Sequence, residues 1–334
     1  MSDKLRPSRR DVFRAAAVLA GAGAGARLGV TPAKATGYPD HPIRIIVPFA
    51  PGGPTDTLGR ILATHLGQAI GGTVVVENRA GAGGNIGMGL AAHSEPDGYT
   101  LLLTTSAYVV NPTLYARAPY DPFTDFVPIA ELATSPNVIL ADPKLGIKTM
   151  AELIARAEAK PSELNYGSPG IGTTPHLTGE LLKIKAGIEI THVPFSGSGP
   201  AVQAVLSGTV QLAVVALPPA HPHIEAGALK ALAVTGPDRW FDLPDVPTMV
   251  ELGYQDFVTD TFQGFLAPAR TPPSIVDQLA AKSLSIVKTA QIAEQLRNNG
   301  FVVLANGPDG LKKRIADEVP KWRDIIIKAG IKPV

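Results

Sequence analysis

Apolar positions along the chain alternate between short β-rich runs and amphipathic helical stripes. The runs at 43–49 (IRIIVPF), 73–78 (TVVVEN), 99–105 (YTLLLTT) and 137–142 (NVILAD) predict strands. Further strands are expected at 164–168, 190–195, 210–216 and 229–236, and helices at 57–70, 149–159, 174–186, 200–207, 273–286, 289–299 and 308–328. This alternation predicts an α/β fold built from βαβ units, with mainly parallel strands.

The alternation pauses twice, which indicates two crossings between domains. The first pause is near residue 140 and the second lies within 245–262. We therefore expect residues 36–140 together with 250–334 to form lobe 1, and residues 141–249 to form lobe 2. Two α/β lobes joined in this way place a cleft between them, where small ligands usually bind.

The first 35 residues have the pattern of a signal peptide that is cleaved near Ala35. Arg9 and Arg10 form a twin-arginine pair, an Ala/Gly-rich apolar run follows, and AKA is a small-x-small cleavage pattern. The sequence therefore predicts a periplasmic protein. The export route stays open between twin-arginine and general secretion, because the phenylalanine of the twin-arginine pattern is expected at position 12 and here is Phe13.

Removing this segment changes the charge balance. The whole chain has a formal net charge of +1, but residues 1–35 hold seven of the 30 Lys and Arg and two of the 29 Asp and Glu. The remaining chain carries a net charge of −4 and has no basic run, which argues against nucleic acid as a partner. The chain contains no cysteine, so disulfides, thiolate metal sites and cysteine nucleophiles are excluded.

Three Gly/Pro-rich loops, each between a predicted strand and a predicted helix, share one design. They are PFAPGGPTD (48–56), NYGSPGIGTTPH (165–176) and PFSGSGP (194–200). A helix start offers unpaired main-chain N–H groups and the positive end of the helix dipole, so it can bind an anion without Lys or Arg. Because such loops lie at the carboxyl ends of strands, we expect them to converge on one anionic ligand. Neutral donors would come from the hydroxyls of Thr55, Ser168, Thr173, Thr174, Ser196 and Ser198.

The missing motifs narrow the choice of anion. No Gly-Lys-Ser/Thr occurs, which excludes a Walker phosphate loop. AGAGGNIG (80–87) has Ile86 where a dinucleotide fingerprint needs glycine, so a turn that allows close backbone packing is the preferred interpretation. We expect no cofactor, and a carboxylate remains as the common small anion.

Catalytic and metal signatures are also missing. His221 and His223 are two residues apart in a Pro-rich stretch, which is not the spacing of a helical metal pair. No G-x-S-x-G occurs. A serine–histidine–acid triad assembled by the fold remains open, but no residue pattern points to one. We therefore predict a non-enzyme with no catalytic residues and no metal site.

The order and spacing of seven blocks over about 38–334 resemble the Bug-type extracytoplasmic receptors of tripartite tricarboxylate transporters. The blocks are YPDHPIRIIVPFAPGGPTDTLGR, VVVENRAGAGGNIG, PDGYTLLL, NPTLYARAPYDPFTDFVPIA, LNYGSPGIGTTPHLTGELL, ITHVPFSGSGPAVQAVLSG and PHIEAGALKALAVTG. The resemblance implies a two-lobed type II periplasmic-binding-protein fold that closes around its ligand. It also implies a small organic carboxylate ligand, a two-component membrane permease as partner, and a receptor that we expect to be a monomer.

The resemblance also transfers binding roles to positions of this chain. The residues implied in ligand binding are Phe49, Pro51, Gly52, Gly53, Thr55 and Asp56 in the first loop, Ser168, Gly170, Gly172, Thr173, Thr174 and His176 in the second, and Ser196 and Gly197 in the third. The resemblance points more weakly to Thr105, Ser106 and Ala107 in a fourth segment. Asp56 is expected to organise N–H groups and waters rather than to touch an anionic ligand.

One position departs from the family pattern. After the strand VQLAVV many members carry an acidic residue, whereas this chain has Ala216 or Leu217 there. The departure favours di- or tricarboxylates or aromatic acids over amino acids. The alternatives are an exported α/β hydrolase and a ligand sensor for a regulatory partner.

Overall fold

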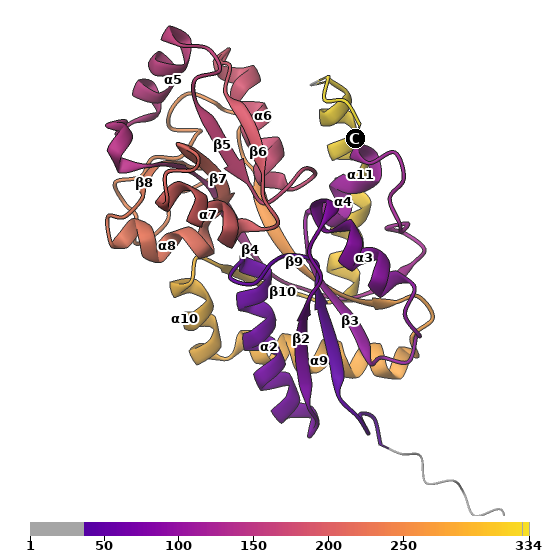
Figure 1. Ribbon diagram of the computed structural model, residues 1–334. Coiled ribbons are helices and arrows are strands. Elements are labelled where there is room, and N and C mark those ends of the chain that lie inside the picture. Colours follow the sequence, from indigo (N-terminus) through magenta and orange to yellow (C-terminus); the bar gives the residue numbers. More distant parts are fainter. Residues whose placement is uncertain (1–36, 329, 334) are drawn as a thin grey trace, which may run out of the picture. The chain divides into compact units, whose positions relative to one another are not determined.

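The elements of the computed structural model (Figure 1) follow the predicted alternation along most of the chain. The structure describes residues 37–328 and 330–333, so the signal peptide expected at 1–35 lies outside the described residues. The helices are α2 (Pro54–Ile70), α3 (Asn85–Ala92), α4 (Ala107–Leu114), α5 (Met150–Ala159), α6 (Thr174–Ala186), α7 (Ser198–Leu206), α8 (Leu217–Glu225), α9 (Pro273–Lys288), α10 (Ala290–Asn298) and α11 (Pro308–Lys328).

The strands differ more from the prediction. They are β1 (Ile43–Val47), β2 (Val74–Asn78), β3 (Thr100–Thr105), β4 (Phe126–Ala141), β5 (Asn165–Ser168), β6 (Thr191–Pro194), β7 (Leu212–Ala216), β8 (Lys230–Val234), β9 (Asp260–Pro268) and β10 (Val302–Asn306). The sequence predicted only the end of β4 and neither β9 nor β10. Strand β4 contains Pro128 and Pro136, and its pairing with β9 is interrupted by bulges, so its pattern lacks a regular alternation.

The strand order is β2-β1-β3-β9-β4-β7-β5-β6, with β10 and β8 also paired to β4. The outer pairs, β1 with β2 and β3, and β5 with β6 and β7, are parallel. All pairings of β4 and β9 are antiparallel. The expectation of mainly parallel sheets was therefore wrong for the centre of the molecule, where the chain crosses between the two halves rather than completing βαβ units.

Four clusters of buried apolar side chains form the cores of the two halves, two clusters in each half. In the first half, β1 and β3 pack against α2, α9 and α10 on one face and against α3, α4 and α11 on the other. In the second half, one cluster joins β7 to α7 and α8, and another joins β5 and β7 to α5 and α6. Met249 and Phe257 belong to this last cluster, so the chain packs with the second half until shortly before β9.

Strands β4 and β9 connect the two halves (Figure 1). Residues Phe126–Pro136 of β4 pair with β9, and residues Asn137–Ala141 of the same strand pair with β7. A strand shared by both halves places the carboxyl ends of β1, β3, β5 and β7 around one cleft. None of the described helices is both long and apolar enough to cross a membrane.

Candidate functional site

A small cavity lies where the two halves meet. Its volume is about 20 Å³, close to the ~10–15 Å³ that one water molecule needs, so a ligand of several carbons enters only if the halves separate. Among the residues that the structure describes, no ionisable side chain lines it. The lining residues are Phe49, Gly53, Pro54, Thr55, Thr105, Pro169, Thr173, Pro175, Ser198, Ala216 and Thr261.

Five helices begin at this cavity. Gly53 and Thr173 are the N-caps of α2 and α6, and Ala216 is the N-cap of α8. Ser198 is the first residue of α7, and Thr105 directly precedes the N-cap of α4. Each helix start presents unpaired N–H groups and a partial positive charge. The cavity is therefore suited to an anion, although no Lys or Arg lines it.

Asp56 organises the first loop from outside the cavity. Its carboxylate accepts hydrogen bonds from the main-chain N–H of Gly52 (3.0 Å), from Arg60 (2.9 and 3.0 Å) and from Asn78 Nδ2 (3.0 Å). Burial by itself raises the pKa of Asp56, but the hydrogen bonds from Arg60, Gly52 and Asn78 outweigh it and lower the pKa. The left-handed φ of +83° at Gly52 is a conformation that glycine adopts without strain.

The second loop is held by hydrogen bonds inside the protein. Thr173 Oγ1 donates to the carbonyl of Gly170 (2.7 Å), and Thr173 Oγ1 also accepts from the N–H of His176 as the N-cap of α6. Ser168 Oγ accepts from the N–H of Gly170 and lies 2.6 Å from His192 Nε2. Ser168 is fully buried and does not line the cavity, so its hydroxyl shapes the loop.

Two neighbouring histidines, whose ring planes are tilted by 33° to each other, support this loop. The rings of His176 and His192 lie 4.3 Å apart. Burial lowers the pKa of His176 to about 4 and that of His192 to about 3, and Lys183 adds to both effects. Both rings are therefore neutral at pH 7.

The same contacts bear on the hydrolase alternative. Ser168 and His192 form a serine–histidine pair, but no carboxylate hydrogen-bonds His192 within the part of the chain that the structure describes. Without an acid to orient the ring, and with the serine buried away from the cavity, the pair lacks the geometry of a nucleophile and its base.

The first and third loops meet across the cleft. The main-chain N–H of Ala50 donates to the carbonyl of Ser196 at 3.0 Å. Gly197 lies directly against Ala50, where a methyl group added to the glycine would stand 3.3 Å from the nitrogen of Ala50. Ser198 then lines the cavity, while Ser196 is exposed to solvent.

A second seam joins the Gly-rich turn 80–87 to the second loop. A Cβ on Gly83 would lie 2.0 Å from the carbonyl oxygen of Ile171, and Tyr115 Oη donates to that same oxygen at 3.0 Å. A Cβ on Gly172 would lie 2.0 Å from Asn111 Oδ1. This is the close backbone packing that the sequence favoured over a dinucleotide site.

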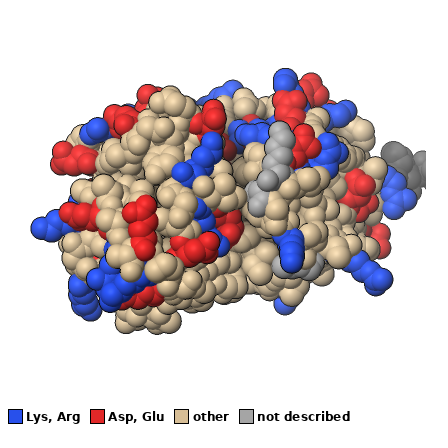
Figure 2. All heavy atoms as spheres, turned by 90° about the horizontal axis from the view of Figure 1, so that it is seen from above, with Lys and Arg blue, Asp and Glu red and all other residues tan. Residues whose placement is uncertain are grey.

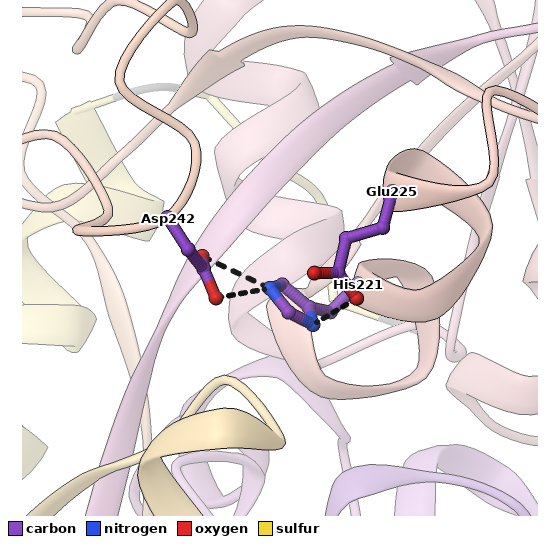
Figure 3. Close-up of side chains that lie close together, drawn as sticks. All are labelled: His221, Glu225 and Asp242. Carbon is purple, nitrogen blue, oxygen red and sulfur yellow. Dashed lines mark hydrogen bonds and ion pairs between the residues drawn. The ribbon is translucent and has the colours of Figure 1, made fainter.

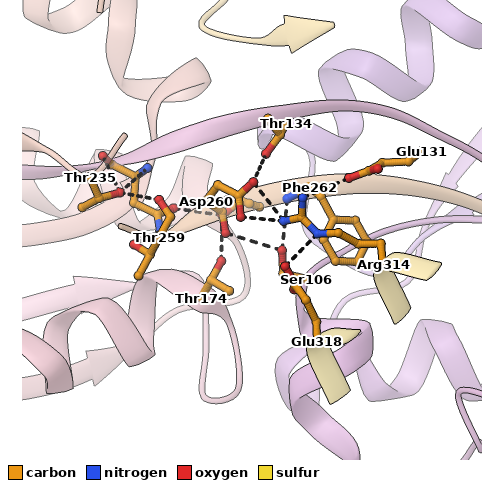
Figure 4. A network of polar contacts seen from close by, with 12 residues as sticks. Ser106, Glu131, Thr134, Thr174, Thr235, Thr259, Asp260, Phe262, Arg314 and Glu318 are labelled. Carbon is orange, nitrogen blue, oxygen red and sulfur yellow. Dashed lines mark hydrogen bonds and ion pairs between the residues drawn. The ribbon is translucent and has the colours of Figure 1, made fainter. Parts of the chain in front are cut away.

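Hydroxyl groups connect helix α6 to the crossing strands (Figure 4). Thr174 Oγ1 and Thr261 Oγ1 are 2.8 Å apart, and Thr261 donates to Asn137 Oδ1 at 2.8 Å. Thr178 and Thr259 continue the network, 2.8 Å from each other and each 3.1 Å from Asn137 Nδ2. The start of α6 is thereby fixed to the strands that join the two halves.

An ion cluster lies beside this network (Figure 4). Arg314 contacts Asp260 (2.7 Å), Glu318 (2.7 Å) and Glu131 (3.3 Å).

Ser106 Oγ accepts a hydrogen bond from the main-chain N–H of Phe262 at 3.0 Å, so Ser106 connects the start of α4 to β9.

The predicted site residues thus fall into three groups. Those that line the cavity are Phe49, Gly53, Thr55, Thr105, Thr173 and Ala216. Those that build the loops or supports around it are Pro51, Gly52, Asp56, Ser106, Ser168, Gly170, Gly172, Thr174, His176, Ser196 and Gly197. Leu217 lies in the apolar core of the second half instead, because it follows Ala216 on the buried side of α8.

Other lining residues were missed. Pro54 and Pro175 were assigned only to helix starts, and Ser198 only as a hydroxyl donor. Pro169 had no signal of its own. Thr261 was missed because β9 was not predicted, and its position depends on pairing with Ser135, far away in the sequence.

A charged triad lies elsewhere on the second half (Figure 3). His221 Nε2 lies 3.0 Å from both carboxylate oxygens of Asp242, and His221 Nδ1 lies 3.6 Å from Glu225 Oε2. The three side chains have the composition of a metal site, but they also suffice to fasten α8 to the loop that carries Asp242.

On the face shown in Figure 2, positive and negative side chains are interspersed.

Comparisons with known proteins agree with this architecture. Residues 58–331 match the model of a protein family described as the tripartite tricarboxylate transporter family receptor. The chain is 38% identical to Protein BugT of Bordetella pertussis over 303 residues, which are 90% of this chain and 93% of BugT.

Two solved structures are similar over almost their whole length. The periplasmic binding protein BugD has a TM-score of 0.86 and 34% identity, over 89% of this chain and 100% of BugD. R. palustris Rpa4515 with adipate gives the same four values. The two-lobed solute-binding fold is therefore shown, and the chain belongs to the receptor family of the tripartite tricarboxylate transporters.

Proposed function

We propose that this chain captures a small organic carboxylate in the periplasm and delivers it to a two-component membrane permease of the tripartite tricarboxylate type. The observation that carries the proposal is the convergence of five helix starts on a cavity that no ionisable side chain lines. Main-chain N–H groups and hydroxyls stabilise an anion there without a bound cofactor. The protein acts as a monomer and needs no nucleic acid.

Binding and closure are coupled in this proposal. The cavity takes Thr55 and Thr105 from the first half and Thr173 and Ser198 from the second. A ligand that touches both halves favours the arrangement in which they meet, so it shifts the population towards the closed form. The permease would then recognise that form. The division into lobe 1 (36–140 with 250–334) and lobe 2 (141–249), and cleavage near Ala35, are part of this proposal.

The ligand lacks an ammonium group. The family resemblance leads us to expect an acid at Ala216 or Leu217. Ala216 lines the cavity, and no lining residue in the described part of the chain offers a negative charge. Burying an ammonium group without a counter-charge is costly. Di- and tricarboxylates and aromatic acids are therefore favoured over amino acids. Support for the carboxylate class comes from Rpa4515, whose structure holds adipate.

A thermal-shift screen tests the proposal. The probes are succinate, adipate, citrate, benzoate, aspartate and glutamate, with calorimetry on each ligand that raises the melting temperature. A receptor gains RT ln(1 + [L]/Kd), which is about 2.7 kcal/mol at 100 times Kd, and leaves its ligand chemically unchanged. Conversion of a stabilising ligand, followed by NMR, would support the hydrolase alternative, and stabilisation by none of the six would refute carboxylate binding.

The delivery step has its own test. Cells that lack the gene for this chain are expected to lose uptake of the radiolabelled ligand found in the screen, and to recover it with the wild-type gene. Unchanged uptake together with tight binding would favour the sensor alternative over transport.

A further inference from the structure

Two buried polar side chains on the crossing strands have no hydrogen-bond partner among the described residues. Both amide atoms of Gln263 are unpaired, and so is Ser135 Oγ. Both residues are 0% exposed. Buried polar groups in folded proteins are almost always paired, so each exception calls for an explanation. Asn137 on the same strand as Ser135 follows the rule, because its side-chain amide is hydrogen-bonded to Thr178, Thr259 and Thr261.

The strand register places these side chains on the same face as the cavity. Thr261 and Gln263 are two residues apart on β9, so they point to one face. Gln263 pairs with Thr105 of β3, and Ser135 of β4 pairs with Thr261. Residues directly opposite each other in antiparallel strands share a face. Thr105 and Thr261 line the cavity. Gln263 and Ser135 do not line it in this closed arrangement, but each is paired with a lining residue and lies on the same face of the strands.

A third residue with an unpaired buried atom lies at the start of helix α2. Thr55 Oγ1 lines the cavity in the first turn of α2, is almost fully buried and has no partner among the described residues. It lies among the helix starts that suit a carboxylate. Thr55 therefore offers an unpaired hydroxyl at the helix starts, while Gln263 and Ser135 offer unpaired groups on the strands.

We propose that Gln263 and Ser135 form a second polar subsite, which binds an oxygen-bearing group at the far end of the ligand. This inference rests on the proposed function. The Gln263 amide donates from Nε2 and accepts at Oε1, and the Ser135 hydroxyl does both. The subsite therefore takes an uncharged hydroxyl or a second carboxyl group, and a plain aliphatic acid leaves it unpaired. The ligand class is a carboxylate whose chain carries a second oxygen group.

Calorimetry with matched ligands tests the subsite. The probes at four carbons are butanoate, 4-hydroxybutanoate and succinate, and those at six carbons are hexanoate, 6-hydroxyhexanoate and adipate. The wild type is expected to bind at least one oxygenated acid tenfold or more tightly than the plain acid of equal length. Gln263→Met, which keeps the size of the side chain, is expected to reduce that preference to within about twofold. The affinity for the plain acid should not fall, because its apolar chain no longer faces an unpaired amide.

Two further variants separate this role from a structural one. Ser135→Ala is expected to lower the same preference, though by less, because it removes one hydroxyl. Gln295→Met on the exposed side of α10 is the matched control and is expected to leave all six affinities unchanged. Without ligand, Gln263→Met is expected to melt at or above the wild-type temperature, because it removes an unpaired buried amide.

The outcomes distinguish the two proposals. If Gln263→Met and Ser135→Ala leave the preference intact, or weaken plain and oxygenated acids equally, the subsite is refuted while the receptor function stands. If none of the six acids binds the wild type, although benzoate does, the subsite alone is refuted. If no carboxylate binds at all, both proposals fall.

Discussion

The main-chain N–H of Ala50 donates to the carbonyl of Ser196 across the cleft, at 3.0 Å. The first belongs to the loop before α2 and the second to the loop before α7, so this bond exists only while the two halves are together. It uses no side chain. Its strength therefore depends on the backbone path of two Gly/Pro-rich loops, and the same holds for the contact between Gly83 and Ile171. Closure depends on small residues at both seams.

The first prediction concerns Gly83→Ala. The added Cβ would stand 2.0 Å from the Ile171 carbonyl oxygen, so the seam cannot form and the closed state is lost. We expect Kd for the ligand to rise at least tenfold, about 1.4 kcal/mol, measured by calorimetry. Small-angle scattering should show that saturating ligand no longer compacts the protein.

Gly71→Ala is the matched control. Gly71 has a similar left-handed φ (+68°, against +62° at Gly83), but a Cβ there meets no atom within 4 Å. Both variants should lose about 1–2 kcal/mol of unfolding free energy from the strained backbone. Equal effects of the two substitutions on Kd would rule out a steric block at the seam.

The second prediction concerns Asp56→Ala. The substitution removes the acceptor for the Gly52 N–H and for Asn78, so the first loop loosens although no ligand contact is lost. We expect Kd to rise about tenfold. Arg60→Gln removes only the exposed ion-pair partner and should change affinity by less than about threefold. Unchanged affinity in Asp56→Ala, with the fold intact by circular dichroism, would contradict the organising role.

The third prediction concerns Ala216→Asp. A carboxylate at this lining position would repel the ligand's own carboxylates and could pair with an ammonium group. We expect the affinity ratio of aspartate to succinate to increase at least tenfold relative to the wild type. Ala216→Asn has the same shape without the charge, and it should leave the ratio unchanged. A similar shift in both variants would show that size, not charge, sets the preference.

The fourth prediction concerns acid stability. The pKa values of His176 and His192, about 4 and about 3, lie below the ordinary value near 6.5. Below pH 6.5 both histidines are protonated in the unfolded state but remain neutral in the native state. The unfolding free energy therefore falls as the pH drops towards 4. The slope approaches about 1.4 kcal/mol per pH unit for each histidine, and neither contributes above pH 7.

Urea unfolding at pH 7.0, 5.5 and 4.5 measures this slope. His192→Gln removes one titrating group and keeps a hydrogen-bonding side chain beside Ser168, so its slope between pH 6 and 4.5 should be shallower than that of the wild type. Parallel curves for the variant and the wild type would mean that His192 is not held neutral by burial.

The fifth prediction concerns Arg314→Met. The variant leaves Glu131, Asp260 and Glu318 without their shared cation. Loss of one partner from a buried ion cluster typically costs about 3–5 kcal/mol, and we expect a loss near the lower value because Asp260 is partly exposed. Adding Glu131→Gln should recover part of the loss.

Arg323→Met on the same helix is the control for this prediction. Its guanidinium contacts Asp324 on the surface, and its removal should cost less than about 0.5 kcal/mol in urea unfolding. If Arg314→Met lowered the unfolding free energy as little as Arg323→Met, the ion cluster around Arg314 would not stabilise the protein.

The sequence by itself determined the local parts of this protein. A strand followed by Gly, Pro and a hydroxyl residue before an apolar stripe predicts a capped helix start, because capping depends on residues within one turn of each other. The same local pattern led us to predict that the three loops bind an anion without Lys or Arg. The resemblance to the receptor family came from the order and spacing of seven blocks along the chain.

Which residues these local elements bring together around the cavity was decided by the tertiary structure alone. It added the starts of α4 and α8 to the cavity, moved Leu217 into the core, and placed Thr261 and Gln263 on the cavity's side of β9. These positions depend on antiparallel pairings between distant residues, such as Ser135 with Thr261. Strand β4 contains prolines and bulges and lacks a regular alternation, so its partners are selected by the packing of both halves and not by any local pattern.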